Sequence, residues 1–342
     1  MSNSISNLEE LDNLLSEPSP GAIETMRRLD GDIILLGVAG KMGPTLARMA
    51  KRASDSAGTA RRIIGVSRFS SPDHETELQR HGIETIRCDL LNESALQKLP
   101  DAPNILYLAG MKFGSTGQES LTWAMNTHLP ALVCKKYQKS KIVAFSTGNV
   151  YGLVPVASGG SVETDLPNPV GEYAMSCLGR ERIFEHFSRT LNIPLAIVRL
   201  NYACEMRYGV LVDLAKKIHA GETIDLNMGW LNTLWQADAN SYTLQCFDHV
   251  TTPPFFINMT GPELLNVKET CEKMAARMDK PVSFSGTAAE TALLNNASRS
   301  FGLSGQPRVN ADQLLTWVVD WVKRSGASLG KPTHFESRDG KF

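Results

Sequence analysis

The sequence predicts an α/β fold in which a parallel, doubly wound sheet is followed by a smaller, partly helical region. From residue 32 to about residue 203, short apolar runs rich in Ile, Val and Leu alternate with amphipathic segments of helical period. After residue 203 this alternation weakens, and irregular stretches separate the helical segments. Short apolar strands that alternate with helices are typical of a parallel sheet covered on both faces.

Composition and charge narrow the classes of function. The chain has 342 residues, 42% of them hydrophobic, and a formal net charge of -1. This charge gives no broad electrostatic footprint for nucleic acid or an acidic membrane. The N-terminus lacks the apolar region of a secretory signal, and no apolar run approaches the ~20 residues of a membrane span. The six cysteines are scattered without metal-ligand spacing, so we expect reduced thiols, no metal site and a cytoplasmic protein.

An N-terminal extension, residues 1–30, precedes the first strand. Its leucines at positions 8, 11, 14 and 15 have helical spacing, and a second short helix is predicted over residues 22–29. We expect the extension to dock on the body of the protein; docking on a partner subunit is the alternative.

The other elements follow in chain order. Strands are predicted at residues 33–37, 62–67, 85–88, 105–109, 141–146 and 195–199, and helices at 44–54, 74–81, 93–99, near 118–138 and at 172–191. Further helices are predicted at residues 208–220, 262–278 and 310–325. The chain is thus divided into the extension, a sheet domain (31–203), a mainly C-terminal region (204–330) and a tail (331–342).

A glycine-rich turn lies between the first strand and the next helix. Gly37, Gly40 and Gly43 have the spacing Gly-x-x-Gly-x-x-Gly, with Lys41 and Met42 between the last two. Glycines let the backbone turn sharply and approach a pyrophosphate, which then lies at the positive end of the helix. The pattern predicts that residues 31–203 form a Rossmann-like dinucleotide-binding domain; a glycine-rich turn that binds nothing is the alternative.

The end of the second strand bears on the choice of cofactor. Arg68 stands there, and positions 65–70 contain no acidic residue. NAD sites usually place an acid at this point for the ribose 2′-hydroxyl, whereas an arginine suits a 2′-phosphate. Arg68 therefore favours NADP over NAD, unless it is a solvated surface arginine.

Two motifs in the middle of the chain carry hydroxyl groups. The fifth predicted strand runs into Ser-Thr-Gly-Asn-Val-Tyr-Gly at positions 146–152, and the helix at 172–191 begins with Tyr-Ala-Met-Ser-Cys at positions 173–177. Over roughly residues 32–323 the sequence resembles the extended short-chain dehydrogenases/reductases of the NAD-dependent epimerase/dehydratase type. That family usually has a lysine four residues after the tyrosine, and this sequence has Cys177 there.

The resemblance implies an NAD(P)-dependent oxidoreductase or epimerase that acts on a carbohydrate-like hydroxyl or ketone. In such an enzyme Tyr173 exchanges a proton with the substrate while hydride passes to or from the nicotinamide. Thr147 orients the substrate oxygen, and Ser146 is a neighbour able to share this role. Residues 204–330 would supply most of the substrate-binding region.

The missing lysine changes the expected chemistry. Cys177 supplies no positive charge to Tyr173, and a phenol has a reference pKa near 10. Arg180 lies about 10 Å farther along the helix axis, so we expect no direct contact with Tyr173; Lys112, from its loop, is the alternative cation. Reduction needs only a neutral proton donor and is therefore easier than oxidation.

The resemblance also implies the other cofactor contacts. They follow the third and fourth strands or lie in the next helix: Asp89, Leu90, Ala109, Gly110, Lys112 and Asn126. Asp89 and Leu90 would face the adenine, although capping of the next helix is an alternative for Asp89. Asn126 would hold a structural water or a backbone group behind the site.

Asn149 and Asn201 are the predicted substrate contacts, with Trp230 as a stacking surface. Residues 226–238 contain two tryptophans and no Lys or Arg, where many members of the family have a basic strand for a nucleotide-sugar phosphate. This favours a smaller, uncharged polyol or a sugar acid as the substrate. Packing in the core or in a dimer is the alternative role of the tryptophans.

Two classes of function remain open. One is the hydride-transfer enzyme described above, and the other is a catalytically impaired dinucleotide-binding sensor or scaffold with the same fold. For either, the resemblance implies a homodimer formed through the helices near 118–138 and at 172–191.

Overall fold

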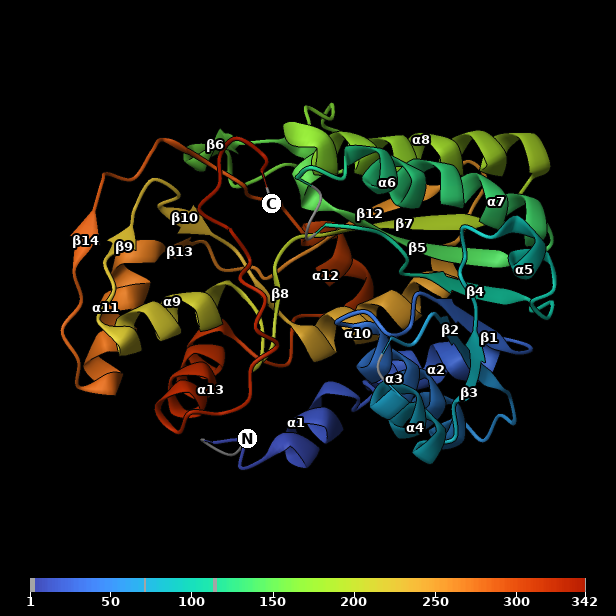
Figure 1. Cartoon of the computed structure of the whole chain (residues 1–342), viewed down its shortest axis with the longest axis horizontal. Helices are drawn as coiled ribbons and strands as arrows, with labels where there is room; N and C mark the ends of the chain where they lie inside the picture. Colours follow the sequence, from blue (N-terminus) through green and yellow to red (C-terminus); the bar gives the residue numbers. More distant parts are fainter. Residues whose placement is uncertain (1–3, 71, 113–115, 342) are drawn as a thin grey trace.

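A computed structural model of the chain describes residues 4–70, 72–112 and 116–341. Residues 1–3 of the predicted extension and residue 342 of the predicted tail therefore lie outside the described residues. At the centre is a seven-stranded sheet in the order β12-β7-β5-β4-β1-β2-β3, with all neighbours parallel (Figure 1). Its strands are β1 Ile33–Leu36, β2 Ile63–Ser67, β3 Glu84–Arg87, β4 Asn104–Tyr107, β5 Lys141–Thr147, β7 Leu195–Leu200 and β12 Phe255–Met259. The strand order reverses between β1 and β4, and ligands of such sheets bind at the carboxyl ends of the strands beside this point.

Both faces of the sheet are covered, which explains the continuous apolar runs. In β1, Ile33 and Leu35 belong to one hydrophobic cluster, whereas Ile34 and Leu36 belong to another. The first cluster includes residues from α2 Pro20–Arg28, α3 Gly43–Ser56 and α10 Gln236–Gln245. The second includes residues from α5 Glu93–Gln97, α7 Leu129–Lys136 and α8 Gly171–Leu191. Alternate residues of one strand therefore fill two separate cores.

The predicted sheet strands and the two N-terminal helices are confirmed. Helices α1 Leu8–Leu15 and α2 pack on α3 and α10 of the same chain, so the extension docks on the body. α4 Pro72–Arg80 lies where a helix was expected, and the helical stretch near 118–138 is divided into α6 Glu119–Trp123, a π-helix Ala124–His128 and α7.

Two of the elements that the sequence-based prediction misses belong to the sheet domain. β12 extends the sheet beside β7, and α10 packs against α2 and α3. All ten residues of α10 are buried, including polar ones, so the helix lacks the one-sided apolar pattern that reveals an amphipathic helix. Because both elements return to the sheet domain, residues 204–330 do not form one continuous outer region.

The C-terminal region contains three packed helices and several two-stranded ladders. The helices are α9 Val210–Ala220, α11 Val267–Met278 and α13 Ala311–Lys323, as expected from their periodicity. The ladders pair β8 Ala203–Cys204 with β11 Leu234–Trp235, β9 Ile224–Asp225 with β14 Phe284–Ser285, β10 Trp230–Leu231 with β13 Leu265–Asn266, and β6 Val154–Pro155 with β15 Thr291–Ala292. The remaining helical pieces are α12 Ser298–Ser304 and short 3-10 turns at Gly148–Tyr151, Val156–Ser158 and Cys246–His249.

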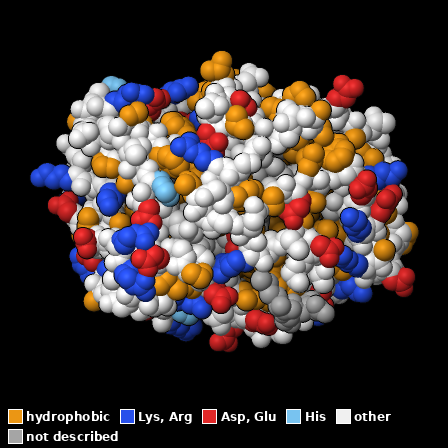
Figure 2. All heavy atoms as spheres, turned by 180° about the vertical axis from the view of Figure 1, so that it is seen from behind, with side chains coloured by type: hydrophobic (Ala, Val, Ile, Leu, Met, Phe, Trp, Pro, Cys, Tyr) orange, Lys and Arg blue, Asp and Glu red, His pale blue; other side chains and the backbone are white. Residues whose placement is uncertain are grey.

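Surface charge, helix hydropathy and the state of the cysteines can be compared with the expectations from the sequence. On the face shown in Figure 2, positive and negative side chains are interspersed, in keeping with the net charge of -1. Among the described helices, none has the length and hydropathy that crossing a bilayer requires. All six cysteines are free and buried, and no group of metal-ligating side chains was found among the described residues.

Candidate active site at the carboxyl edge of the sheet

The glycine-rich turn packs tightly between β1, β4 and α3. Gly37 has φ of +91°, and a Cβ at this position would lie 2.8 Å from the backbone N and Cα of Ala109. A Cβ on Gly43 would lie 2.0 Å from the carbonyl oxygen of Val38. Both positions therefore require glycine. α3 begins at Gly43 after Met42 and has no side-chain cap, which leaves backbone N–H groups of its first turn available to an anion.

Lysine side chains gather beside this turn. Lys41 Nζ lies 3.4 Å from the centroid of the Tyr208 ring. Burial, followed by repulsion from Lys112 and Lys331, lowers the pKa of Lys41 to about 6. Burial lowers the pKa of Lys112 to about 8. A dinucleotide pyrophosphate is the kind of anion that offsets such repulsion, so the turn and its lysines fit a dinucleotide cofactor.

Cofactor binding is expected to be accompanied by proton uptake at pH 8. Lys41 is mostly neutral at that pH, and an adjacent pyrophosphate raises its pKa, so binding draws about one proton from solution. Calorimetric titrations in buffers of different ionisation enthalpy measure this number directly. Lys41→Met should remove most of the uptake and Lys98→Met, an exposed control, none of it; equal uptake by wild type and Lys41→Met would contradict the assignment.

The other predicted cofactor contacts lie at the same edge. Arg68 is exposed at the end of β2. The carboxylate of Asp89 accepts a hydrogen bond from Leu91 N at 3.1 Å, and the N-cap of α5 is Asn92. Asp89 therefore does not cap the helix, and it remains exposed, whereas Leu90 is buried.

Asn126 joins three elements behind the site. It lies in the π-helix, a local widening that is frequent at functional sites. Its amide donates to the carbonyl oxygen of Met111 and to Ser176 Oγ, both at 2.9 Å, and accepts from Met111 N at 2.9 Å. Asn126 therefore fixes the backbone that follows Ala109 and Gly110, in line with the expectation that it holds a backbone group.

The two predicted catalytic motifs meet at the end of β5. Tyr173 of α8 packs against Cys177 and against the 3-10 turn that follows Thr147, and both Thr147 and Cys177 lie near enough to affect the pKa of its phenol. Thr147 Oγ1 accepts from the backbone N and the side-chain Nδ2 of Asn149, at 3.2 and 2.9 Å. With both lone pairs of Oγ1 engaged, the Thr147 O–H is left to donate to a further acceptor. Burial and then the neighbouring thiol raise the pKa of Tyr173 above its usual range.

Ser146 points to a different network. Its hydroxyl donates to Glu181 Oε1 at 2.6 Å, and Glu181 forms a buried, bidentate ion pair with Arg199. Arg199 also donates to the Tyr151 hydroxyl at 2.6 Å. Adjacent residues of a strand face opposite sides, which separates Ser146 from Thr147. The structure thus places Ser146 in this buried network instead of beside Tyr173.

The substrate candidates divide into two groups. Asn201 is buried at the end of β7, and its Oδ1 has no hydrogen-bond partner among the described residues. Asn295, which carried no sequence signal, is also buried, and neither atom of its amide group is paired within the described part of the chain. A Cβ on Gly148 would lie 2.7 Å from that amide, so both asparagines adjoin the Thr147 turn. Trp230 instead packs against the main core from β10.

Comparison with known families identifies this arrangement. The model of the NAD dependent epimerase/dehydratase family matches residues 33–228, which include the glycine turn, Thr147, Tyr173 and Asn201. The chain belongs to this family. The predicted fold class and family are thereby confirmed. A comparison with curated proteins found no match.

Solved structures with the epimerase/dehydratase fold support the architecture. The UDP-glucuronic acid 4-epimerase of Bacillus cereus, in complex with UDP-glucuronic acid and NAD, is 19% identical with a TM-score of 0.69, covering 86% of this chain and 99% of its own. The dTDP-glucose 4,6-dehydratase of Bacillus anthracis, in complex with NAD, is 17% identical with a TM-score of 0.72, covering 86% and 97%. The UDP-glucose 4-epimerase of Thermotoga maritima is 16% identical with a TM-score of 0.67, covering 86% and 99%.

In this member of the epimerase/dehydratase family, the C-terminal residues reach the site. We name residues 326–341 the C-terminal strap; it leaves α13, passes α9 and ends near the start of α8 (Figure 1). Thr333 donates from its N and Oγ1 to Asp213 Oδ2 at 2.7 and 2.6 Å, and Phe335 is 2% exposed. Arg338 donates to the carbonyl oxygen and the hydroxyl of Thr291 at 2.9 and 2.6 Å. These contacts fasten the strap to the body.

The end of the strap narrows the space beside Asn149. A cavity of about 30 Å³ lies there, lined by Asn149, Gly152, Leu153, Val170, Tyr202 and Leu293 of the body and by Ser337, Arg338 and Gly340 of the strap. Gly340 packs so closely on the N-terminus of α8 that a Cβ on Gly171 would lie 2.5 Å from its carbonyl oxygen. Pockets that hold small molecules usually measure about 300–1,000 Å³, so the strap closes this end of the site.

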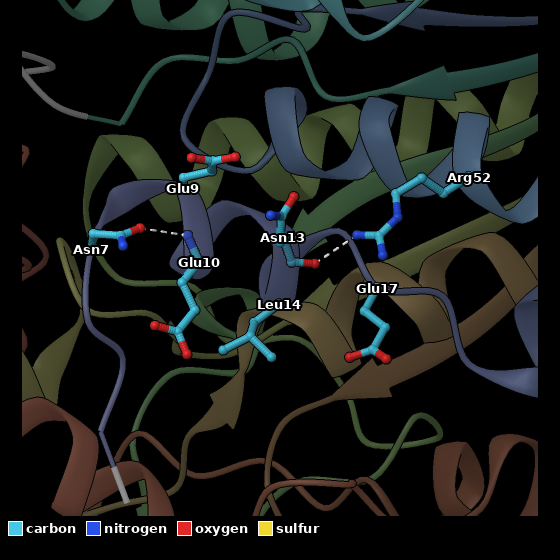
Figure 3. Close-up of a pocket in the computed structure, with 7 residues that line it drawn as sticks. All are labelled: Asn7, Glu9, Glu10, Asn13, Leu14, Glu17 and Arg52. Atoms are coloured by element: carbon cyan, nitrogen blue, oxygen red, sulfur yellow. Dashed lines mark hydrogen bonds between the residues drawn. The ribbon is translucent and has the colours of Figure 1, made fainter. Parts of the chain in front are cut away.

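A larger hollow lies elsewhere and does not adjoin the catalytic residues. It has a volume of about 400 Å³ and is lined by α1 with its flanking residues and by Arg52 of α3 (Figure 3). In Figure 1, α1 and α8 lie on opposite sides of the molecule. The Tyr173 region remains the candidate active site of this family member.

Proposed function

We propose that the protein catalyses NAD(P)-dependent hydride transfer at a carbohydrate-like hydroxyl or ketone. The observation that carries the proposal is that Tyr173 packs on the turn that Thr147 begins, at the carboxyl edge of the sheet that bears the glycine turn. A bound nicotinamide supplies or accepts the hydride. The chain's own groups then have to bind and orient the substrate oxygen and move one proton.

Thr147 orients the substrate oxygen and Tyr173 moves the proton. Thr147 accepts two hydrogen bonds from Asn149, which leaves its O–H to donate to a substrate oxygen and orient it beside Tyr173. For reduction, neutral Tyr173 donates its phenolic proton to the carbonyl oxygen as hydride arrives at the carbon. For oxidation, Tyr173 must first be ionised, and its raised pKa opposes this. We therefore propose that reduction is the faster direction.

The polar groups near Thr147 support a small polyhydroxylated substrate. Asn201 and Asn295 bury amide atoms that are unpaired within the described residues, and such atoms suit substrate hydroxyl groups. The relatives named above bind nucleotide sugars or act on them, but the strap leaves about 30 Å³ beside Asn149. We propose that the substrate is a small polyol, sugar acid or corresponding ketone without a nucleotide.

Removing the strap is expected to broaden this specificity. A variant that ends at Gly326 should gain at least about tenfold in affinity for a nucleotide sugar such as UDP-glucose, because space closed by residues 337–340 opens. Arg338→Ala, which loses the hydrogen bonds to Thr291, should show part of the gain, and Lys341→Ala, an exposed control, none. Equal affinity of the full-length and shortened proteins, measured by calorimetry, would exclude this role of the strap.

The cofactor specificity follows from the end of β2. Exposed Arg68 and the absence of an acid at positions 65–70 favour NADP, whereas the relatives were crystallised with NAD. We propose that both dinucleotides bind, with a modest preference for NADP that Arg68→Ala abolishes.

A homodimer through α6 and α8 is also proposed. Apolar side chains are exposed on these adjacent helices: Leu121 (40%), Trp123 (38%) and Met175 (45%). Trp123 Nε1 donates to Glu172 Oε2 at 2.5 Å, which joins the two helices into one surface. The six reduced, buried cysteines favour a reducing compartment such as the cytoplasm.

The proposed reaction is tested with a panel of substrates. Purified protein is incubated with each reduced and oxidised nicotinamide cofactor and with ketones, polyols, sugar acids and nucleotide sugars, and absorbance of the reduced nicotinamide is followed. We expect turnover of small ketones. Tight cofactor binding without hydride exchange on any substrate would favour the alternative, a dinucleotide-binding sensor or scaffold.

A further inference from the structure

A buried cation lies one helical turn beyond Cys177. Arg180 is only 6% exposed, and its Nη1 and Nη2 donate to the carbonyl oxygen of Phe145 at 3.0 Å and to Asn126 Oδ1 at 2.6 Å. Both acceptors are neutral. Among the ion pairs of the described residues none includes Arg180, and the adjacent Glu181 is paired with Arg199. A buried cation without an acidic partner is costly, and an unexplained one at a site is a candidate for function.

The side chain of Arg180 points back toward the active site. Helical side chains tilt toward the N-terminus, so residues at 173, 177 and 180 share one face of α8. The tip of Arg180 reaches the loop after β4, where a Cβ on Gly110 would lie 2.4 Å from Nη2. Its Nε is buried and has no hydrogen-bond partner among the described residues. The Arg180 contacts among the described residues are with Phe145, Asn126 and the Tyr107 ring and none is with Tyr173, but the backward reach of this long side chain brings its charge to the same loop as the site.

The Arg180 charge acts to lower the pKa values of Tyr173 and Cys177, and a lower pKa of Tyr173 is what oxidation requires. Burial raises the pKa of both Tyr173 and Cys177, and the Arg180 guanidinium opposes each rise. Within the described part of the chain, the other groups named around Tyr173 are Cys177 on α8, Thr147 on β5, and Lys112 from the loop after β4, whose Nζ lies 5.6 Å from the centroid of the tyrosine ring. The titratable side chain that faces Arg180 from β4 is Tyr107, with its ring centroid 5.9 Å from Arg180 Cζ. Lys112 loses its charge near pH 8, whereas an arginine keeps it throughout the physiological range.

We propose that Arg180 is the positioning residue whose permanent charge stabilises ionised Tyr173 and so permits the oxidative direction of the proposed reaction. The role rests on the proposed function. It explains how a protein with cysteine at position 177 retains a positive charge beneath its tyrosine: the charge comes from three residues farther along the helix. Cys177 leaves room for this arrangement, since a second cation at 177 would face Arg180 directly.

The proposal is tested by comparing the two directions of the reaction in Arg180→Met. The pH at which oxidation reaches half its maximum should rise by about one unit or more, which slows oxidation about tenfold per unit at lower pH. Reduction, which uses neutral Tyr173, should change less. Arg180→Lys should restore most of the oxidation rate, and Arg182→Met, an exposed change on the same helix, should alter neither direction.

Moving the positive charge from position 180 to position 177 distinguishes an electrostatic role of Arg180 from a role in folding. Cys177→Lys alone should unfold at a lower urea concentration and oxidise the substrate no faster than wild type, because its ammonium is repelled by the Arg180 guanidinium. Adding Arg180→Met to that variant should restore both the stability and the oxidation rate. The role of Arg180 would be overturned, with the proposed function left intact, by either of two results for Arg180→Met. One is a pH dependence of the oxidation rate equal to that of the wild type, and the other is an equal fall in the rates of oxidation and reduction. Failure of the wild type to turn over any substrate would overturn both the role and the proposed function, and stability that is additive across the two substitutions would show that the two positions do not interact.

Discussion

Replacing Tyr173 by phenylalanine is expected to lower the rate of ketone reduction by about 10²–10⁴-fold, the usual contribution of general acid–base catalysis. The substitution removes the hydroxyl beside Thr147 and Cys177 and leaves the glycine turn untouched. Cofactor affinity should therefore stay within about twofold. The measurement is kcat and the dissociation constant of the reduced cofactor for both proteins.

Tyr137→Phe is a matched control for Tyr173→Phe. Tyr137 is a buried tyrosine, whereas Tyr173 is half-buried, and the Tyr137 hydroxyl donates to the carbonyl oxygen of Pro100, away from the site. This variant should keep full activity. If Tyr173→Phe and Tyr137→Phe had the same activity, Tyr173 would not be the proton donor.

Breaking the buried ion pair beneath β5 is expected to have the largest effect on stability. The side chains of Glu181 and Arg199 are 1% and 4% exposed, and the pair is bidentate. Glu181→Gln keeps the shape of the side chain but leaves Arg199 without its counter-charge. Such a change typically lowers the free energy of unfolding by about 3–5 kcal/mol, because an uncompensated charge remains buried. Urea titration followed by circular dichroism measures the difference.

Glu185→Gln serves as the comparison on the same helix. Glu185 pairs with Arg182 and Arg189, whose side chains are both 57% exposed, and pairs of this kind contribute about 0–1 kcal/mol. If Glu181→Gln were no more destabilising than Glu185→Gln, the buried network would not be what holds α8 against β5 and β7.

Much of the sheet was predictable because its strands carry their own signal. β1, β2, β4, β5 and β7 are short apolar runs, and each is buried on both faces. Parallel topology then brings the carboxyl ends of these strands to one edge, which carries both the glycine turn and Thr147. Tyr173 lies at the same edge because α8 begins there.

The elements that were missed lack local periodicity or depend on distant contacts. α10 is buried all round, and Asn240 and Gln236 on it bond Thr45 of α3 across nearly two hundred residues of sequence. Asn295 lies in an irregular stretch, and only the fold brings it to Gly148. The strap has polar, glycine-containing sequence that predicts a tail, and its anchors Asp213 and Thr291 lie far away in the chain.

The missing lysine shows how a motif can be misread when one position is considered alone. Position 177 has a cysteine where the family usually has a lysine, so the sequence pattern shows only that this positive charge is absent. The folded helix carries a buried arginine one turn later, with its tip under the loop that follows β4. The charge at the site therefore depends on side-chain direction as well as on residue spacing.

Tyr173 is proposed to protonate a substrate oxygen while hydride arrives from a nicotinamide. The most direct measurement is single-turnover transfer of deuterium from a reduced cofactor labelled at C4 to a ketone substrate, followed by mass spectrometry. We predict that wild type places the label on the new carbinol carbon and that Tyr173→Phe does so about 10²–10⁴ times more slowly. An unlabelled product from wild type, or equal rates of label transfer in the two proteins, would contradict the claim.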